Sequence, residues 1–90
     1  MTPADRSPQP LVHLGEGARA VVADIVLPID SADQQLVLRL MELGFVPGEL
    51  VRVLRRSGGD GGPMAVRVGH STFALRPHEA SFILVIPEQS

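Results

Sequence analysis

The sequence contains no cysteine, no tryptophan, no tyrosine and no lysine. Without cysteine the chain can form neither a disulfide nor a thiolate metal site, and it has no thiol nucleophile. The three phenylalanines are its only large aromatic side chains, which is too few for an aromatic cage or a base-stacking platform. No run of residues approaches the roughly 20 apolar positions that a membrane-spanning helix needs, so direct membrane insertion is not expected.

The charge balance is slightly acidic, with eight arginines, ten acidic residues and a formal net charge of −2 in 90 residues. Nucleic-acid-binding proteins draw much of their affinity from excess positive charge, so a nucleic-acid partner is not expected. The length suits a single domain. Residues 1–10 contain three prolines and no hydrophobic run, which predicts a disordered N-terminal lead rather than a signal peptide. Lacking a signal, a span and cysteines, the chain is expected to be cytoplasmic.

The clearest predicted element is a helix over Ser31–Leu43. Leucines at every third or fourth position give it one apolar stripe. Its first residue and Gln34 have the spacing of a capping box. Gly44 stands where a left-handed residue ends a helix, which places Leu40 and Phe45 in the contact typical of a Schellman motif.

Short runs rich in Val, Ile and Leu, bounded by Gly and Pro, predict a mainly β fold. Strands are expected at residues 19–27, 50–56, 64–68, 71–75 and 82–86. Pro47 and Gly48 have the order of a type II turn, and Gly62 and Pro63 end a Gly-rich loop. Five short strands would leave exposed edges in an open sheet, so we expect a small barrel of the SH3 kind with the helix inserted between its first two strands.

The sequence carries no catalytic motif, and we expect neither enzymatic activity nor a required cofactor. There is no Gly-x-Ser-x-Gly elbow, and the Gly-rich loop runs into Pro63 and a strand instead of the Lys and helix of a P-loop. The only candidate metal ligands outside the carboxylates are the scattered histidines His13, His70 and His78. Their spacing does not match a dedicated site, so at most weak binding of Fe²⁺ or Zn²⁺ is expected.

A protein with no pocket motif and little net charge is expected to act by contact with a partner. The inserted helix is the element that such a barrel presents most easily. The predicted partner-binding residues are Arg39, Glu42, Phe45 and Val46. The alternative is that these residues form a solvated helix face and a buried turn. A second candidate surface is formed by Arg52 and Arg56, which share one face of their strand if it alternates regularly.

The order and spacing of these motifs resemble the FeoA family, small proteins of the bacterial ferrous iron transport system. The resemblance covers Leu11 to Ile86. It rests on residues 39–48, 51–53, 62–64 and 74–76, with Glu79, Ala80, Ile83 and Val85. It implies one FeoA-like, SH3-like domain over residues 11–87, followed by a short tail at residues 88–90. The family's usual Pro-Leu before the Gly-Pro turn is replaced here by residues 57–61, which leaves the conformation of that loop open.

This resemblance implies a cytosolic protein that acts on FeoB, the membrane ferrous iron transporter with a cytosolic G-protein domain. The same module is found at the C-terminus of DtxR-type metal-dependent repressors. Two functions therefore stay open. The first is an accessory or regulatory protein that binds FeoB, and the second is a metal-responsive module that binds Fe²⁺ or a similar ion. Neither implies an oligomeric state.

Overall fold

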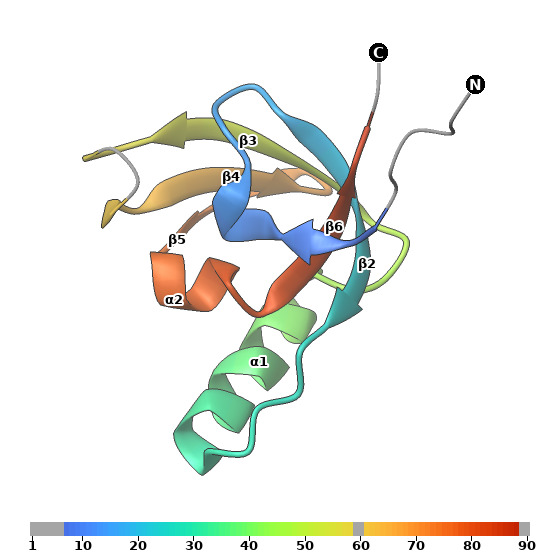
Figure 1. The fold of residues 1–90 in the computed structure, drawn as a ribbon, viewed down its shortest axis with the longest axis vertical. Coiled ribbons are helices and arrows are strands. Elements are labelled where there is room, and N and C mark those ends of the chain that lie inside the picture. The colour runs from blue at the N-terminus through green and yellow to red at the C-terminus, as the bar shows by residue number, and fades with distance from the viewer. Residues whose placement is uncertain (1–6, 59–60, 89–90) are drawn as a thin grey trace.

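The computed structural model describes residues 7–58 and 61–88, which form a curled antiparallel sheet with one long helix projecting from it (Figure 1). The strands are β1 (Gln9–Pro10), β2 (Arg19–Ile25), β3 (Leu50–Arg56), β4 (Met64–Val68), β5 (Ser71–Leu75) and β6 (Ile83–Pro87). The helices are a 3-10 turn η1 (Leu11–His13), the long helix α1 (Ser31–Leu43) and the short α2 (Pro77–Ala80). The predicted bounds of β3, β4, β5 and α1 are confirmed.

The sheet contains six strands in the order β1-β6-β2-β3-β4-β5, and this order does not join its two ends. The prediction of a closed five-stranded barrel is therefore not confirmed. The additional strand is β1, whose residues Gln9 and Pro10 pair with Val85 and Leu84 of β6. Because proline cannot donate to a ladder, it argues against a strand at most positions, and a two-residue edge strand gives almost no sequence signal.

The termini of the chain differ from prediction where the structure describes them. Gln9 and Pro10 belong to the sheet rather than to the predicted disordered lead. Glu88, placed in the predicted tail, donates its backbone N–H to the carbonyl oxygen of Arg19 at 2.8 Å. Residues 1–6 of the lead and 89–90 of the tail lie outside the described residues.

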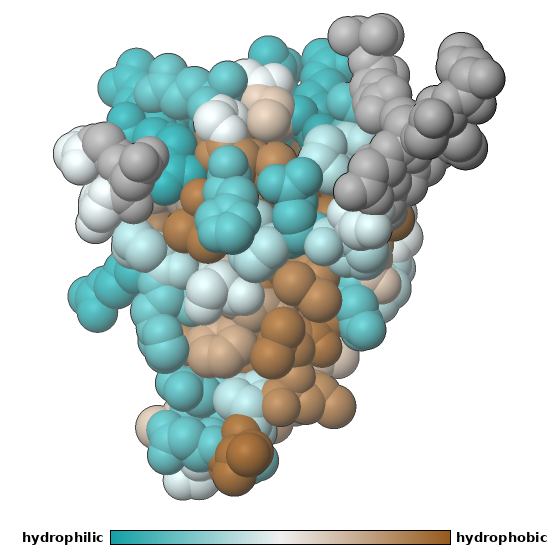
Figure 2. Space-filling view, viewed as in Figure 1, coloured by the Kyte–Doolittle hydropathy of each residue, from teal (hydrophilic) through white to brown (hydrophobic). Residues whose placement is uncertain are grey.

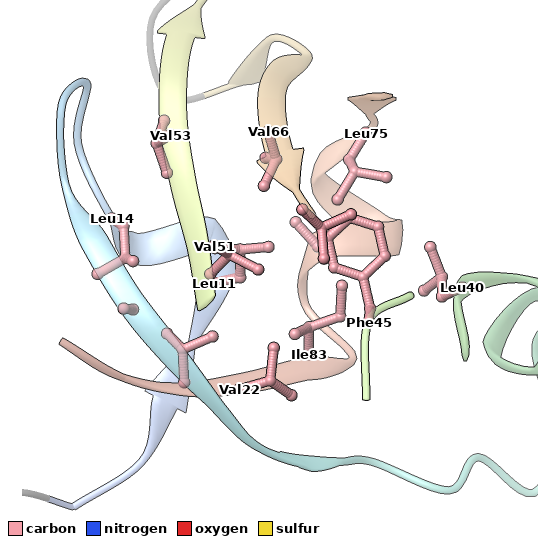
Figure 3. Packing of buried hydrophobic residues seen from close by; sticks show 14 of the residues in the cluster. Leu11, Leu14, Val22, Leu40, Phe45, Val51, Val53, Val66, Leu75 and Ile83 are labelled. Atoms are coloured by element: carbon pink, nitrogen blue, oxygen red, sulfur yellow. The ribbon is translucent and has the colours of Figure 1, made fainter. Parts of the chain in front are cut away.

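One hydrophobic core fills the curl of the sheet (Figure 3). Alternate side chains of the strands point into it, as the period of two requires. Its largest fully buried side chain is Phe45, which lies beside Leu40 of α1. The ring centroid of Phe45 is 6.1 Å from that of the half-buried Phe73 on β5. The core therefore joins the helix to the sheet.

The start of α1 is held differently from the prediction. Asp30 is its N-cap and no side chain caps the first turn, so the predicted capping box is wrong. Instead, Nε2 of Gln34 donates to the carbonyl oxygens of Pro28 and Ile29, at 3.0 and 3.3 Å. The linker between β2 and α1 is thereby tied back onto the first turn of the helix.

The end of α1 is a Schellman motif, as predicted. Gly44 has a φ of +116°. The N–H of Phe45 donates to the carbonyl oxygen of Leu40 at 3.1 Å, and that of Gly44 donates to Met41 at 3.0 Å. This pair of bonds satisfies carbonyls that the helix would otherwise leave open, and it directs the Phe45 side chain into the core.

Two further glycines fix the turns that follow. Gly48 has a φ of +95°, and the N–H of Glu49 donates to the carbonyl oxygen of Val46 at 3.1 Å, as a type II turn requires. At the end of the Gly-rich loop, a Cβ on Gly62 would lie 1.5 Å from the carbonyl oxygen of Ser57. Only glycine therefore fits at that position.

We predict that Gly44→Ala lowers the free energy of unfolding by about 1–2 kcal/mol, because an L residue is strained at this positive φ. A methyl group there would lie 3.6 Å from Val68 Cγ2, an ordinary contact, so the cost is conformational. Gly15→Ala is the matched control, since its Cβ would meet nothing within 4 Å. Urea unfolding of both variants measures the difference, and equal stabilities would contradict this account.

Candidate functional site

The exposed apolar side chains of the described residues are concentrated at one place. Five of the seven large ones lie on the β2–α1 linker and the outer face of α1. They are Val26, Leu27, Ile29, Leu38 and Met41. Ile29 is 97% exposed and Leu27 is 80% exposed. In Figure 2 apolar side chains gather at the lower right, where Figure 1 places the linker and the helix.

The gathering of exposed apolar side chains in one area makes this surface a candidate interaction site. We call these five residues, together with Arg39, Glu42 and Val46, the helix surface. Leu38 and Met41 form a ridge with a hollow on each side. One hollow, of about 310 Å³, lies against the linker residues Leu27 and Pro28. The other, of about 830 Å³, is bordered by the three added residues and Gln35.

The predicted partner residues have different positions. Arg39 and Glu42 are exposed on the outer side of α1, and Val46 is half-buried next to them. Phe45 is wrong as a surface candidate because it is fully buried. The Schellman motif explains this burial, since Phe45, the second residue past the helix, packs back against Leu40, three residues before its last residue.

Arg52 and Arg56 do not share a face, and that prediction is wrong. A β-bulge between Val53 and Arg55 shifts the register against β4, so side chains beyond it change sides. Arg56 is therefore paired with the buried Met64, while Arg52 stays exposed. The guanidinium of Arg56 turns inward.

Arg56 connects β3 to the start of the described chain. Its Nη1 donates to the carbonyl oxygens of Val12 and Leu14, at 2.7 and 2.8 Å. Its backbone N–H donates to Oε2 of Glu16 at 2.9 Å. These contacts make Arg56 a structural residue that holds η1 against the sheet.

We predict that Arg56→Met lowers the free energy of unfolding by about 2–3 kcal/mol, because two charge-assisted bonds to carbonyl groups are lost. Arg55→Met removes the same charge from an exposed neighbour and is expected to change stability by less than about 0.5 kcal/mol. Urea unfolding compares the two variants. Equal effects would mean that charge, and not the bonds to η1, accounts for the change.

Arg52 instead belongs to a row of arginines that the sequence did not reveal. It lies directly opposite Arg19 of β2 and Arg67 of β4, and Thr72 of β5 continues the row. Residues directly opposite in an antiparallel sheet point to the same side, and all four are exposed. We call Arg19, Arg52 and Arg67 the arginine row. A hollow of about 320 Å³ lies along it, with Leu50 and Glu88 also on its wall.

The three histidines lie apart from one another. His13 ends η1, His70 is in the turn between β4 and β5, and His78 is in α2. Nε2 of His78 is 2.9 Å from Oδ1 of Asp33, which joins α2 to α1. Within residues 7–58 and 61–88 no three His, Asp or Glu side chains are grouped closely enough to hold a metal ion. Over the same residues, no helix is long and apolar enough to cross a membrane.

A curled antiparallel sheet with one projecting helix defines a small, mainly β domain. A family model described as the FeoA domain matches residues 9–87. The chain belongs to the FeoA family, whose members serve ferrous iron transport.

Solved structures agree with this assignment. FeoA of Stenotrophomonas maltophilia complexed with zinc, described as a prokaryotic SH3 domain protein, is 35% identical, with a TM-score of 0.76 over 88% of this chain and 94% of that chain. FeoA of Chlorobium tepidum is 32% identical, with a TM-score of 0.67 over 87% of this chain and 70% of that chain. A manganese-dependent transcriptional repressor is 26% identical, with a TM-score of 0.72 over 96% of this chain and 43% of that chain. A search of curated protein sequences found no match.

Proposed function

We propose that this protein is a cytoplasmic accessory protein of ferrous iron uptake that regulates a FeoB-type membrane transporter by binding its cytosolic part. The helix surface is the contact, and the protein itself catalyses no reaction. The observation that carries this proposal is the concentration of exposed aliphatic side chains on α1 and its linker in a member of the FeoA family. The FeoA of Stenotrophomonas maltophilia has been put forward as a ferrous iron transport activating factor, which agrees with such a role.

The helix surface has the composition of a contact site. Burial of an exposed aliphatic side chain stabilises an interface by about 1.5–3 kcal/mol. Leu27, Ile29 and Leu38 are all more than half exposed, so a partner that covers them would bury most of their surface. Arg39 and Glu42 supply polar groups beside the apolar ridge, as an interface rim does.

Helix α1 is also held in a fixed orientation before any partner binds. The bonds of Gln34 fasten its first turn to the linker, the Schellman motif fixes its end, and the His78–Asp33 pair ties its first turns to α2. Little conformational entropy is then lost on binding, which favours affinity.

We predict that Leu38→Asp weakens binding to the cytosolic domains of FeoB by about ten- to a hundredfold, the loss of an interface anchor worth about 1–3 kcal/mol. Arg39→Glu and Val46→Asp are expected to weaken it in the same direction. Isothermal titration calorimetry with purified FeoB domains measures the dissociation constants. Circular dichroism melting curves establish that each variant is folded.

Leu54→Asp is the matched control for Leu38→Asp. Leu54 is also an exposed leucine, but it lies on β3 and not on the helix surface. Its substitution introduces the same charge and should leave the affinity for FeoB unchanged. If Leu54→Asp weakens binding and Leu38→Asp does not, the contact lies on the sheet instead.

A second candidate function is that of a metal-responsive module, favoured by the zinc complex of the Stenotrophomonas maltophilia relative. Among the described residues, His78 and Asp33 lie next to each other. A zinc site uses three or four protein ligands, and this pair would supply two of them. The side chains present therefore fit a weak or shared site better than a complete one.

We predict that Zn²⁺ or Fe²⁺ at a concentration equal to that of the protein leaves the melting temperature almost unchanged. A complete site, with metal at a hundred times its dissociation constant, would add about 2.7 kcal/mol of stability. Differential scanning calorimetry with and without metal separates the two functions. A large shift that His78→Ala abolishes would favour the metal-responsive module over the accessory protein.

A further inference from the structure

The arginine row places like charges where a sheet ordinarily avoids them. Arg19, Arg52 and Arg67 are direct cross-strand partners on three neighbouring strands. Like charges directly opposite one another destabilise a sheet. Among residues 7–58 and 61–88 the one ion pair is that of His78 with Asp33, so no arginine of the row forms an ion pair, although Glu88 lies on the wall of the hollow along the row. A negatively charged ligand would neutralise the charge that remains on the row.

Charge is unevenly distributed along the chain, although the protein is acidic overall. Residues 20–50, which contain α1 and the helix surface, carry five acidic residues and only Arg39 as a base. Residues 51–88 carry five arginines and three acidic residues. Around the hollow, the three guanidinium groups of the row stand against the single carboxylate of Glu88. This face therefore carries local positive charge on a molecule whose net charge is −2, and such a field attracts anions to one place.

The geometry of the row fits a linear anion. Neighbouring strands lie about 4.8 Å apart, so the three side chains start at intervals over about 10 Å. A guanidinium is a planar fork that matches the oxygens of a phosphate group and can hold it with two bonds. The hollow along the row, of about 320 Å³, has room for several phosphate groups and has Leu50 as an apolar wall.

We propose that the arginine row is a binding site for an oligophosphate, a chain of two or more phosphate groups, either free or carried by a nucleotide. The row binds the phosphate oxygens, and Leu50 contacts whatever apolar group the phosphates carry. The proposal is independent of the contact with FeoB, since the row lies on the sheet and the helix surface lies on α1 and its linker.

Titration of the labelled protein with sodium tripolyphosphate, followed by amide NMR shifts, tests the proposal in about 50 mM salt, where screening is moderate. We expect a dissociation constant below about 1 mM, with shifts centred on β2, β3 and β4 beside the row. Citrate serves as a compact carboxylate anion and should bind at least about tenfold more weakly. No saturable binding, or equal binding of citrate, would overturn the proposal.

A second titration separates the two sources of phosphate. Adenosine triphosphate that binds like tripolyphosphate indicates that the phosphate chain alone is recognised. Tighter binding, with additional shifts at Leu50, indicates a nucleotide. Either outcome supports the proposal, whereas a nucleotide that shifts only amides remote from the row contradicts it.

Variants locate the site. Arg52→Gln removes the central guanidinium and should weaken tripolyphosphate binding at least about tenfold. Arg55→Gln removes the same charge from an exposed position three residues after Arg52 on the same strand, and should weaken binding less than about twofold. Because Arg52→Gln also relieves repulsion, its melting temperature at low salt should equal or exceed that of the parent. Equal losses of binding in both variants would mean that overall charge, and not this site, attracts the anion.

Discussion

The packing of helix α1 against the sheet depends on the buried side chain of Phe45. The residue comes two positions after the end of α1, and its side chain is fully enclosed between Leu40 of the helix and the strands. The two positive-φ glycines on either side of this segment, Gly44 and Gly48, turn the chain so that it can reach this position. Without that anchor, a helix with two fully buried residues would have little to hold it against the sheet.

Local signals account for what the sequence could predict. The end of α1, the turn at Gly48 and the bounds of β3 to β5 each depend on residues adjacent in sequence, and glycines that take a positive φ marked two of them. The position of Phe45 could have been predicted as well, because the Schellman motif that was recognised already requires it to face inward.

Features that depend on pairing between strands distant in sequence could not be predicted from the sequence. The bulge in β3 moves Arg56 away from the face of Arg52, yet nothing in the residues of that strand indicates an irregular register. The arginine row likewise depends on the alignment of three strands, one of them separated from the next by the whole of α1. Knowledge of the β4–β5 hairpin alone would have placed Arg67 opposite Thr72 and still not beside Arg52.

The described chain enters and leaves the domain on neighbouring strands. Gln9 of β1 lies opposite Val85 of β6, and both strands are at the end of the molecule away from the first turn of α1 (Figure 1). Polypeptide joined before β1 or after β6 would therefore begin on the side of the domain away from the first turn of α1. A longer protein can therefore contain this fold as one of its domains. The manganese-dependent repressor is such a longer protein, since the part that matches this chain is 43% of its length.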